Sequence, residues 1–394
     1  MDYLKKNKKI IILYIGIFIT TFANMVEPML TILLQKKFSL TAFQISLVLI
    51  IQSILLLIAS ILGGILADYC NRKYNIIICD SISAILFIIC VMIPFSLCSV
   101  LLIILGGAFQ HMELASYNTI LDELVDEEDQ DKGFALYFLF WTVGALFSSA
   151  IAGFFVVDYT KIIFITNGIG VLFSSSLILF FFKYTPKIIE KTHTNSKGLG
   201  LKVFKMQPIL IWLLLAILIY EVVHNQYVYM LPMETNRIFN NNGPAIYGTM
   251  ISVGSIFAVL LTTIITNIVH KKTHIFKLQL ANFAQGLGFL TILIGCITIK
   301  IPFFYIGFLI FTVGEIFSNI SYTPYLMSKT PDEYKGRING IFSTTFKISA
   351  IIFNPLIGVL YDKNPYYSWG LMGIVTILSI FIISHINKLD IQNK

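Results

Sequence analysis

The feature that most limits the fold of this chain is a series of long apolar stretches, separated only by short polar segments. A membrane-spanning helix needs about 20 apolar residues to cross the hydrocarbon of a bilayer. Charged residues make up 12% of the 394-residue sequence, about half of the share found in soluble domains. We expect an all-α membrane protein with twelve spanning helices. They are placed at residues 10–34, 42–67, 75–96, 98–121, 133–157, 161–182, 207–232, 245–268, 276–297, 302–327, 338–360 and 367–386.

The positions of the 28 Lys and Arg residues predict how the chain crosses the membrane. With the N-terminus in the cytoplasm, 21 of them fall on the cytoplasmic side and six, including Arg237, fall in outer loops, while Lys347 lies inside a helix. Lys and Arg accumulate on the cytoplasmic side of membrane proteins. We therefore expect both termini in the cytoplasm and place the protein in a bacterial plasma membrane. The net charge of +7 then reflects orientation and does not indicate nucleic-acid binding.

The longest polar stretch carries six Lys residues and separates two sets of six expected helices. The predicted domains are an N-terminal six-helix bundle at 1–182, a cytoplasmic linker at 183–206 and a C-terminal six-helix bundle at 207–394.

The two halves of the sequence resemble each other. The turn that begins at Asp68 recurs about 199 residues later, from Asn267, and the polar segment that begins at Tyr117 recurs 205 residues later, from Tyr322. Repeats of this kind fit two bundles related by an axis along the membrane normal, with a substrate site between them near the midplane. The sequence thus predicts two pseudo-symmetric bundles.

The turn between the second and third expected helices has the sequence GGILADYCNRK, from Gly63 to Lys73. Asn71 is a residue type that tolerates the left-handed backbone that a tight turn can need. The pattern resembles the loop signature of the major facilitator superfamily of transporters, which also has twelve spans, a basic central segment and repeated halves. The resemblance implies a cytoplasmic gate in which Asp68 and Arg72 bond to neighbouring helix ends. The matching gate residues are Gly64, Asp68, Arg72 and Lys73.

Carboxylates inside the expected spans are the first candidates for function, because a charged group is costly there. The deep glutamates are Glu27, Glu113, Glu221 and Glu315. Lys347 is the single deep cation, and the resulting negative excess favours cationic solutes. Asp80 lies nearer the end of its helix, where we expect it to reach water.

Each deep glutamate has polar neighbours at helical spacing. They are Asn24 beside Glu27, Gln110 and His111 beside Glu113, His224 and Asn225 beside Glu221, and Asn319 beside Glu315. These groups either hold helices together by hydrogen bonds or line a polar cavity, and the sequence leaves both readings open. Pro28, next to Glu27, is expected to kink the first helix.

The family resemblance extends these assignments. In the superfamily, the helices that carry these four glutamates line the central cavity. The tenth and eleventh helices are most similar to LmrP-type proton-coupled multidrug transporters, through Gly314-Glu315-Ile316, Gly336, Asn339-Gly340 and Lys347, which implies a proton-coupling role for Glu315. We expect proton or cation coupling by Glu315, Glu221, Lys347 and His224, with Lys347 as the counter-ion of Glu315. The expected substrate cavity contains Asn24, Glu27, Gln110, His111, Glu113, Asn225 and Asn319.

The expected function is secondary active transport by alternating access, with proton-coupled efflux of cationic amphipathic compounds. Alternatives are a proton-coupled carrier of a specific metabolite, peptide or siderophore, and a lipid flippase. An integral membrane enzyme is disfavoured, since no nucleophile–base set, phosphate loop or metal motif is recognised. We expect no cofactor, no bound metal and no nucleic acid, and a monomer whose partners are the bilayer, protons and a small-molecule substrate.

Overall fold

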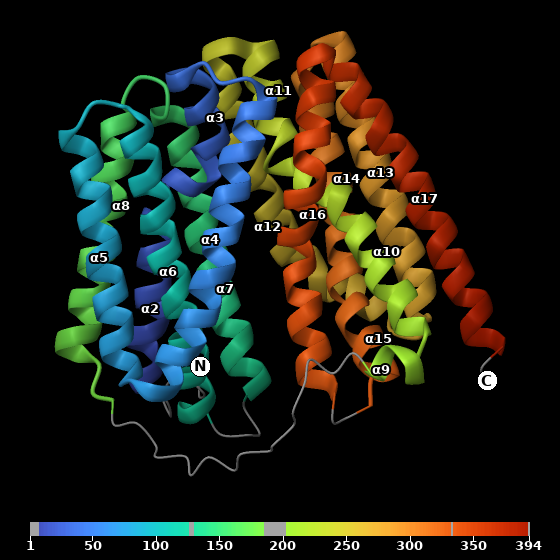
Figure 1. Cartoon of the computed structure of the whole chain (residues 1–394), viewed down its shortest axis with the longest axis horizontal. Coiled ribbons are helices and arrows are strands. Elements are labelled where there is room, and N and C mark those ends of the chain that lie inside the picture. The colour runs from blue at the N-terminus through green and yellow to red at the C-terminus, as the bar shows by residue number, and fades with distance from the viewer. Residues whose placement is uncertain (1–7, 126–129, 185–201, 332–333, 393–394) are drawn as a thin grey trace. The chain divides into compact units, whose positions relative to one another are not determined.

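A computed structural model describes residues 8–125, 130–184, 202–331 and 334–392. Within these ranges every regular element is a helix (Figure 1), which confirms the predicted all-α fold. The α-helices are α2 (Lys8–Ala23), α3 (Val26–Phe38), α4 (Ala42–Tyr69), α5 (Arg72–Met92), α6 (Leu97–Leu124), α7 (Gln130–Phe155), α8 (Thr160–Phe181), α9 (Lys202–Met206), α10 (Ile209–His224), α11 (Met230–Phe239), α12 (Gly243–Val269), α13 (His274–Thr298), α14 (Ile301–Asn319), α15 (Tyr322–Lys329), α16 (Lys335–Lys363) and α17 (Pro365–Gln392). Two single 3₁₀ turns, η2 (Asn225–Tyr227) and η3 (Asn240–Asn242), flank α11.

Eleven segments of the described chain are long and apolar enough to span a membrane. One of them, Ile209–Val269, contains 61 residues. At about 1.5 Å per residue its helical length would be roughly three times the thickness of the hydrocarbon core. It includes both the predicted helix at 207–232 and the predicted helix at 245–268, joined through α11 and η3 rather than by a long loop. This segment therefore accounts for two of the twelve predicted crossings.

Three of the predicted spans are broken in the middle, and the same residue type stands beside each break. The breaks separate α2 from α3, α10 from α11, and α14 from α15. The third residue of each second segment is a proline, namely Pro28, Pro232 and Pro324. Proline has no N–H and its ring clashes with the carbonyl four residues earlier, whereas in the first turn of a helix that N–H is not needed. The helix consequently ends before each proline and starts again around it.

The first break corrects the expectation of a kink at Pro28. The helix is interrupted at Asn24 and Met25 instead, because Asn24 carries the carbonyl that an alanine at position 28 would have bonded. That carbonyl has a replacement partner: Ser148 on α7 donates its hydroxyl to the Asn24 oxygen at 2.6 Å.

Contacts divide the chain into two compact units. Unit 1 takes described residues within Met1–Ser39, Ile51–Lys191 and Phe239–Ser252, and unit 2 takes those within Leu40–Ile50, Thr192–Ile238 and Val253–Lys394. The predicted domain boundaries stay a prediction; in these units the first part of α4 groups with unit 2 and the first part of α12 with unit 1. Residues 185–201 of the predicted linker lie outside the described chain, and the linker stays a prediction.

The two units repeat one packing scheme. In unit 1, α2 packs on α7 and α8, and α5 packs on α6 and α8; in unit 2, α10 packs on α16 and α17, and α13 packs on α14 and α17. The helix ends are tied in the same way. Tyr184 donates to Glu123 across 61 residues, and Lys329 binds Asp390 across the same separation. This correspondence is what an internal duplication of the six-helix bundle produces.

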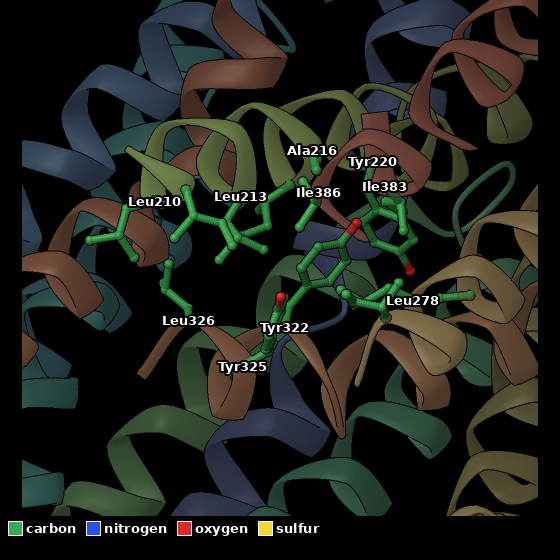
Figure 2. Packing of buried hydrophobic residues seen from close by; sticks show 14 of the residues in the cluster. Leu210, Leu213, Ala216, Tyr220, Leu278, Tyr322, Tyr325, Leu326, Ile383 and Ile386 are labelled. Carbon is green, nitrogen blue, oxygen red and sulfur yellow. The ribbon is translucent and has the colours of Figure 1, made fainter. Parts of the chain in front are cut away.

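The core of unit 2 fixes the end of α10 in place. Figure 2 shows side chains from α10, α13, α15 and α17 meeting in one apolar cluster, among them Leu213, Leu278, Leu326 and Ile383. Tyr220 belongs to this cluster, and its ring centroid lies 5.5 Å from that of Tyr322. The helix is thus packed on several sides immediately before its break.

Candidate functional site

The last turn of α10 places His224 between two carboxylates in unit 2. Its Nδ1 lies 3.3 Å from Oε2 of Glu221 on the same helix, and its Nε2 lies 3.8 Å from Oε1 of Glu315 on α14. The side chains of His224, Glu221 and Glu315 are 13%, 18% and 40% exposed. A protonated imidazole has an N–H on each nitrogen, whereas the neutral ring has only one. Neither contact is a hydrogen bond in this geometry, so the two carboxylates favour a protonated imidazole through their charge.

Aromatic rings surround the His224 imidazole on its faces and edges. Tyr220 and Phe311 are stacked with it, at centroid distances of 5.7 Å and 5.4 Å. Tyr227 and Phe346 meet it edge-on, at 5.1 Å and 5.9 Å. Aromatic faces attract a cation through the ring quadrupole. The rings and the carboxylates thus both favour the positively charged form of the His224 imidazole.

The break after α10 connects this site to α16. Asn225, the first residue of η2, donates from Nδ2 to the Glu221 carbonyl at 2.8 Å and to the Phe346 carbonyl at 3.1 Å. Lys347, the neighbour of Phe346, is half-buried on α16. The pairing of Lys347 with Glu315 stays a prediction. The ion-pair partner found for Glu315 is His224. Asn319 is the exposed last residue of α14.

In unit 1 a chain of amide groups joins three helices. Asn24 donates from Nδ2 to Oε2 of Glu27 at 2.7 Å and accepts at Oδ1 from Asn167 at 3.4 Å. Gln110 on α6 donates to Oδ1 of Asn167 at 3.3 Å. The sequence analysis missed Asn167, because a single Asn in an apolar helix has no charged neighbour to mark it. The chain brings Asn24, Glu27 and Gln110 into one network.

Glu113 is separate from that network. It is 1% exposed and lies among packed helices, while its neighbour His111 is half-buried. The expectation that Asp80 reaches water is wrong, because Asp80 is 0% exposed. It lies eight residues into α5, or about 12 Å along the helix axis, and its carboxyl group faces that of Glu113.

The start of α5 carries a compact ionic cluster. Arg72 places Nη1 2.5 Å from Oε1 of Glu123 at the end of α6, and donates to the Tyr184 hydroxyl at 3.0 Å. Tyr184 in turn donates to Oε2 of Glu123 at 2.5 Å. Burial raises the pKa of Tyr184, and its hydrogen bond to Glu123 adds to the rise, so the phenol stays a donor at neutral pH. Glu123 and Tyr184 were missed because neither belongs to the turn motif.

The other gate residues have distinct local roles. Asn71 has an extended backbone, with φ −68° and ψ 114°, and its side chain accepts from the Lys73 N–H. Asn71 therefore does not use the left-handed conformation that its residue type tolerates, and it is the N-cap of α5. Lys73 donates from Nζ to the Leu179 carbonyl at 2.9 Å, near the end of α8. Asp68 is exposed on the last turn of α4 and contributes to the electrostatic field at Arg72.

The motif glycine and the tightly packed glycine are different residues. A Cβ added at Gly64 would meet nothing within 4 Å, whereas one at Gly63 would lie 2.3 Å from the Met112 carbonyl oxygen. The close approach of α4 to α6 therefore requires Gly63.

A second ionic cluster lies at α11 in unit 2 and joins a buried Glu234 to an exposed Arg237. Arg237 donates from Nη2 and Nε to the two oxygens of Glu234 at 2.6 Å and 2.9 Å. Tyr361 on α16 donates to Oε2 of Glu234 at 2.6 Å, and Glu234 is fully buried. The outer-loop placement of Arg237 is thus wrong, because the polar segment that contains it folds as a helix. Within the described chain, no three His, Cys, Asp or Glu side chains are grouped to hold a metal ion.

Comparisons with known proteins agree on one family. The model of the family described as Major Facilitator Superfamily matches residues 12–354. No curated protein sequence matches the chain.

Three solved structures illustrate the likeness in fold. The nucleoside transporter NupG has 15% sequence identity and a TM-score of 0.80, with 95% of this chain and 99% of that chain covered. A POT family transporter in complex with 5-aminolevulinic acid has 15% identity and a TM-score of 0.75, covering 96% and 95%. A bacterial homolog of the human lysosomal transporter Spinster, inward-facing and occupied, has 12% identity and a TM-score of 0.73, covering 97% of each chain.

Proposed function

Because the chain belongs to the Major Facilitator Superfamily, we propose that it is a proton-coupled secondary carrier of a small organic solute. It works by alternating access, as a monomer in a bacterial plasma membrane with both termini in the cytoplasm. The observation that carries this proposal is the position of His224, with Glu221 at one ring nitrogen and Glu315 at the other.

The site supports proton coupling through a change of charge. Burial disfavours an isolated charge, while a close opposite charge stabilises it. With a proton on His224 the three groups carry one negative charge, and without it they carry two. A solute cation that approaches Glu315, the most exposed of the three, competes with the proton for the same carboxylates. Binding of solute and release of the proton then become linked.

The solute class follows from the same groups. Two carboxylates beside a histidine that is surrounded by aromatic rings suit a solute with an amino group or another cationic centre. Peptides and 5-aminolevulinic acid carry amino groups, and transporters of similar fold are described in complex with such ligands. We therefore place a specific carrier of an amino-bearing solute first.

A second candidate is multidrug efflux of cationic amphipathic compounds. The observation that favours it is the aromatic surround of His224, formed by Tyr220, Tyr227, Phe311 and Phe346. Flat aromatic surfaces accept cations of many shapes. The two candidates differ in the range of solutes bound.

A thermal-shift screen of the purified protein separates these candidates. A ligand that binds only the folded state raises the stability of the protein. Dialanine, 5-aminolevulinic acid, uridine and ethidium are therefore tested as ligands, each at an acidic and an alkaline pH. Stabilisation by a single class supports a specific carrier, and stabilisation by ethidium and other dyes supports multidrug transport.

The coupling is then tested in proteoliposomes with the stabilising solute. We expect Glu315→Gln to abolish accumulation driven by a pH gradient, whereas Asp158→Asn, a carboxylate-to-amide change in an exposed loop, leaves it intact. Gradient-driven accumulation at the wild-type rate in Glu315→Gln would remove Glu315 from the mechanism.

A further inference from the structure

Unit 1 contains a pair of buried acids that the proposed transport function does not use. Asp80 on α5 and Glu113 on α6 are 0% and 1% exposed, and their carboxyl groups interact electrostatically with each other. Even so, both Asp80 oxygens and Oε2 of Glu113 lack a hydrogen-bond partner among the described residues. Two ionised carboxylates can only accept, so the pair needs a donor from elsewhere.

Among the described residues of α5 and α6, the cations and histidine nearest to the pair along each helix are engaged elsewhere or lie on another face. Arg72 and Lys73, at the start of α5, lie eight and seven residues from Asp80, about 10 Å or more along the axis. Both are engaged elsewhere, with Glu123 and with the Leu179 carbonyl. On α6, His111 stands two residues before Glu113, and such positions do not share a helix face.

The titratable groups that do face the pair are neutral at physiological pH. They are the Cys79 thiol on α5, the Tyr117 phenol on α6 and the Tyr137 phenol on α7. The described middle turns of α2 and α8, which also pack here, contain no charged side chain. Two adjacent negative charges would therefore be desolvated without an opposite charge, a state that proteins avoid by binding a proton.

Two buried hydroxyl groups stand one turn after the two acids, and neither supplies the donor that the pair needs. Tyr117 lies one helical turn after Glu113, and Ser83 lies one turn after Asp80. Each is at most 1% exposed, and neither hydroxyl oxygen has a hydrogen-bond partner among the described residues. The Tyr117 phenol interacts electrostatically with both acids. Neither hydroxyl donates to the pair in this geometry, and the Tyr117 oxygen lies beside Gly16 and Ser174.

We propose that Asp80 and Glu113 form a proton-binding site in unit 1, distinct from the His224 site in unit 2. A proton from water binds one carboxylate oxygen and makes an O–H that donates to the facing carboxylate, so the charge of the pair falls from −2 to −1. The pair binds this proton at equilibrium, and the proposal does not depend on the proposed transport function.

The test is infrared difference spectroscopy of the purified protein at neutral pH, with no solute and no gradient. We expect wild type to show the carbonyl stretch of a protonated carboxyl group, and the Asp80→Asn/Glu113→Gln variant to lose it. Glu315→Gln retains the band. A band that is unchanged in the double variant, or absent from wild type, overturns the proposal.

A single variant protects the test against misfolding. In Asp80→Asn the new amide can donate to Glu113 in place of the proton, so this variant is expected to fold and still to lose the band. Thermal unfolding gives a second readout. The wild-type fold holds a proton that the unfolded chain releases, so its stability falls as pH rises, and the double variant loses this slope. Stabilisation of wild type by sodium chloride but not choline chloride, absent in the double variant, would instead identify a metal-cation site and overturn the proton assignment.

Discussion

The hydroxyl of Ser148 is predicted to stabilise the break between α2 and α3 by its hydrogen bond to the Asn24 carbonyl. Pro28 cannot donate to the Asn24 carbonyl, and Ser148 donates to it at 2.6 Å from a side chain that is 1% exposed. Ser148→Ala leaves this carbonyl without its partner. An unsatisfied buried acceptor costs about 1–3 kcal/mol. Because Asn24 is itself half-buried, we expect the lower part of this range, about 1–2 kcal/mol.

The assay is thermal unfolding of the purified protein in detergent. For a folding unit of about 200 residues, each kcal/mol lowers Tm by roughly 2–4 °C, so Ser148→Ala should lower Tm by about 2–8 °C. Ser175→Ala is the matched control. Ser175 is also buried, but its hydroxyl bonds the Leu172 carbonyl within its own helix, and that carbonyl keeps its backbone partner.

A second substitution tests the cause. Pro28→Ala provides an N–H four residues after Asn24, which can replace the serine hydroxyl. The Pro28→Ala/Ser148→Ala double variant should therefore recover at least half of the decrease in Tm caused by Ser148→Ala alone. Such non-additivity is expected of groups that share a partner. Equal Tm values for Ser148→Ala and Ser175→Ala, or strict additivity in the double variant, would refute the reasoning.

Three further predictions address packing and the ionic clusters. Gly288→Ala places a Cβ 2.6 Å from the Gly307 carbonyl oxygen and should cost about 1–3 kcal/mol by overpacking, whereas Gly373→Ala, which meets nothing within 4 Å, should leave Tm unchanged. Glu123→Gln removes the charge that pairs with buried Arg72 and should lower the free energy of unfolding by roughly 3 kcal/mol. An unaltered Tm in thermal unfolding would contradict this role of the ion pair. Tyr361→Phe removes one hydrogen bond to Glu234 and should cost about 1 kcal/mol or somewhat more, with less effect than Glu234→Gln.

Span positions were predictable from the sequence because hydrophobicity over about 20 residues is a strong local signal. The breaks inside three spans were not recognised, although their cause is also local. Pro28, Pro232 and Pro324 each stand third in the helix that follows a break, and this regularity becomes visible only when the three positions are compared. A rule that places a helix break a few residues before a proline, rather than a kink at the proline, would have found all three breaks.

Within the candidate site, same-helix neighbours were more predictable than partners across helices. Helical spacing correctly grouped Glu221 with His224, but spacing along one helix contains no information on which side chain of α14 or α16 comes closest. The contact between His224 and Glu315 depends on how α10 packs against its neighbours. Likewise, the partner of Arg72, Glu123, lies 51 residues away in a segment without a motif.

The central claim is that His224, held between Glu221 and Glu315, carries a proton whose release accompanies solute binding. The most direct measurement is the proton released into weakly buffered solution when the purified protein binds the solute that stabilised it in the thermal-shift screen. We predict release by wild type and by Asp158→Asn, and none by His224→Gln or Glu315→Gln that still bind the solute. Equal proton release by wild type and by both site variants would contradict the account.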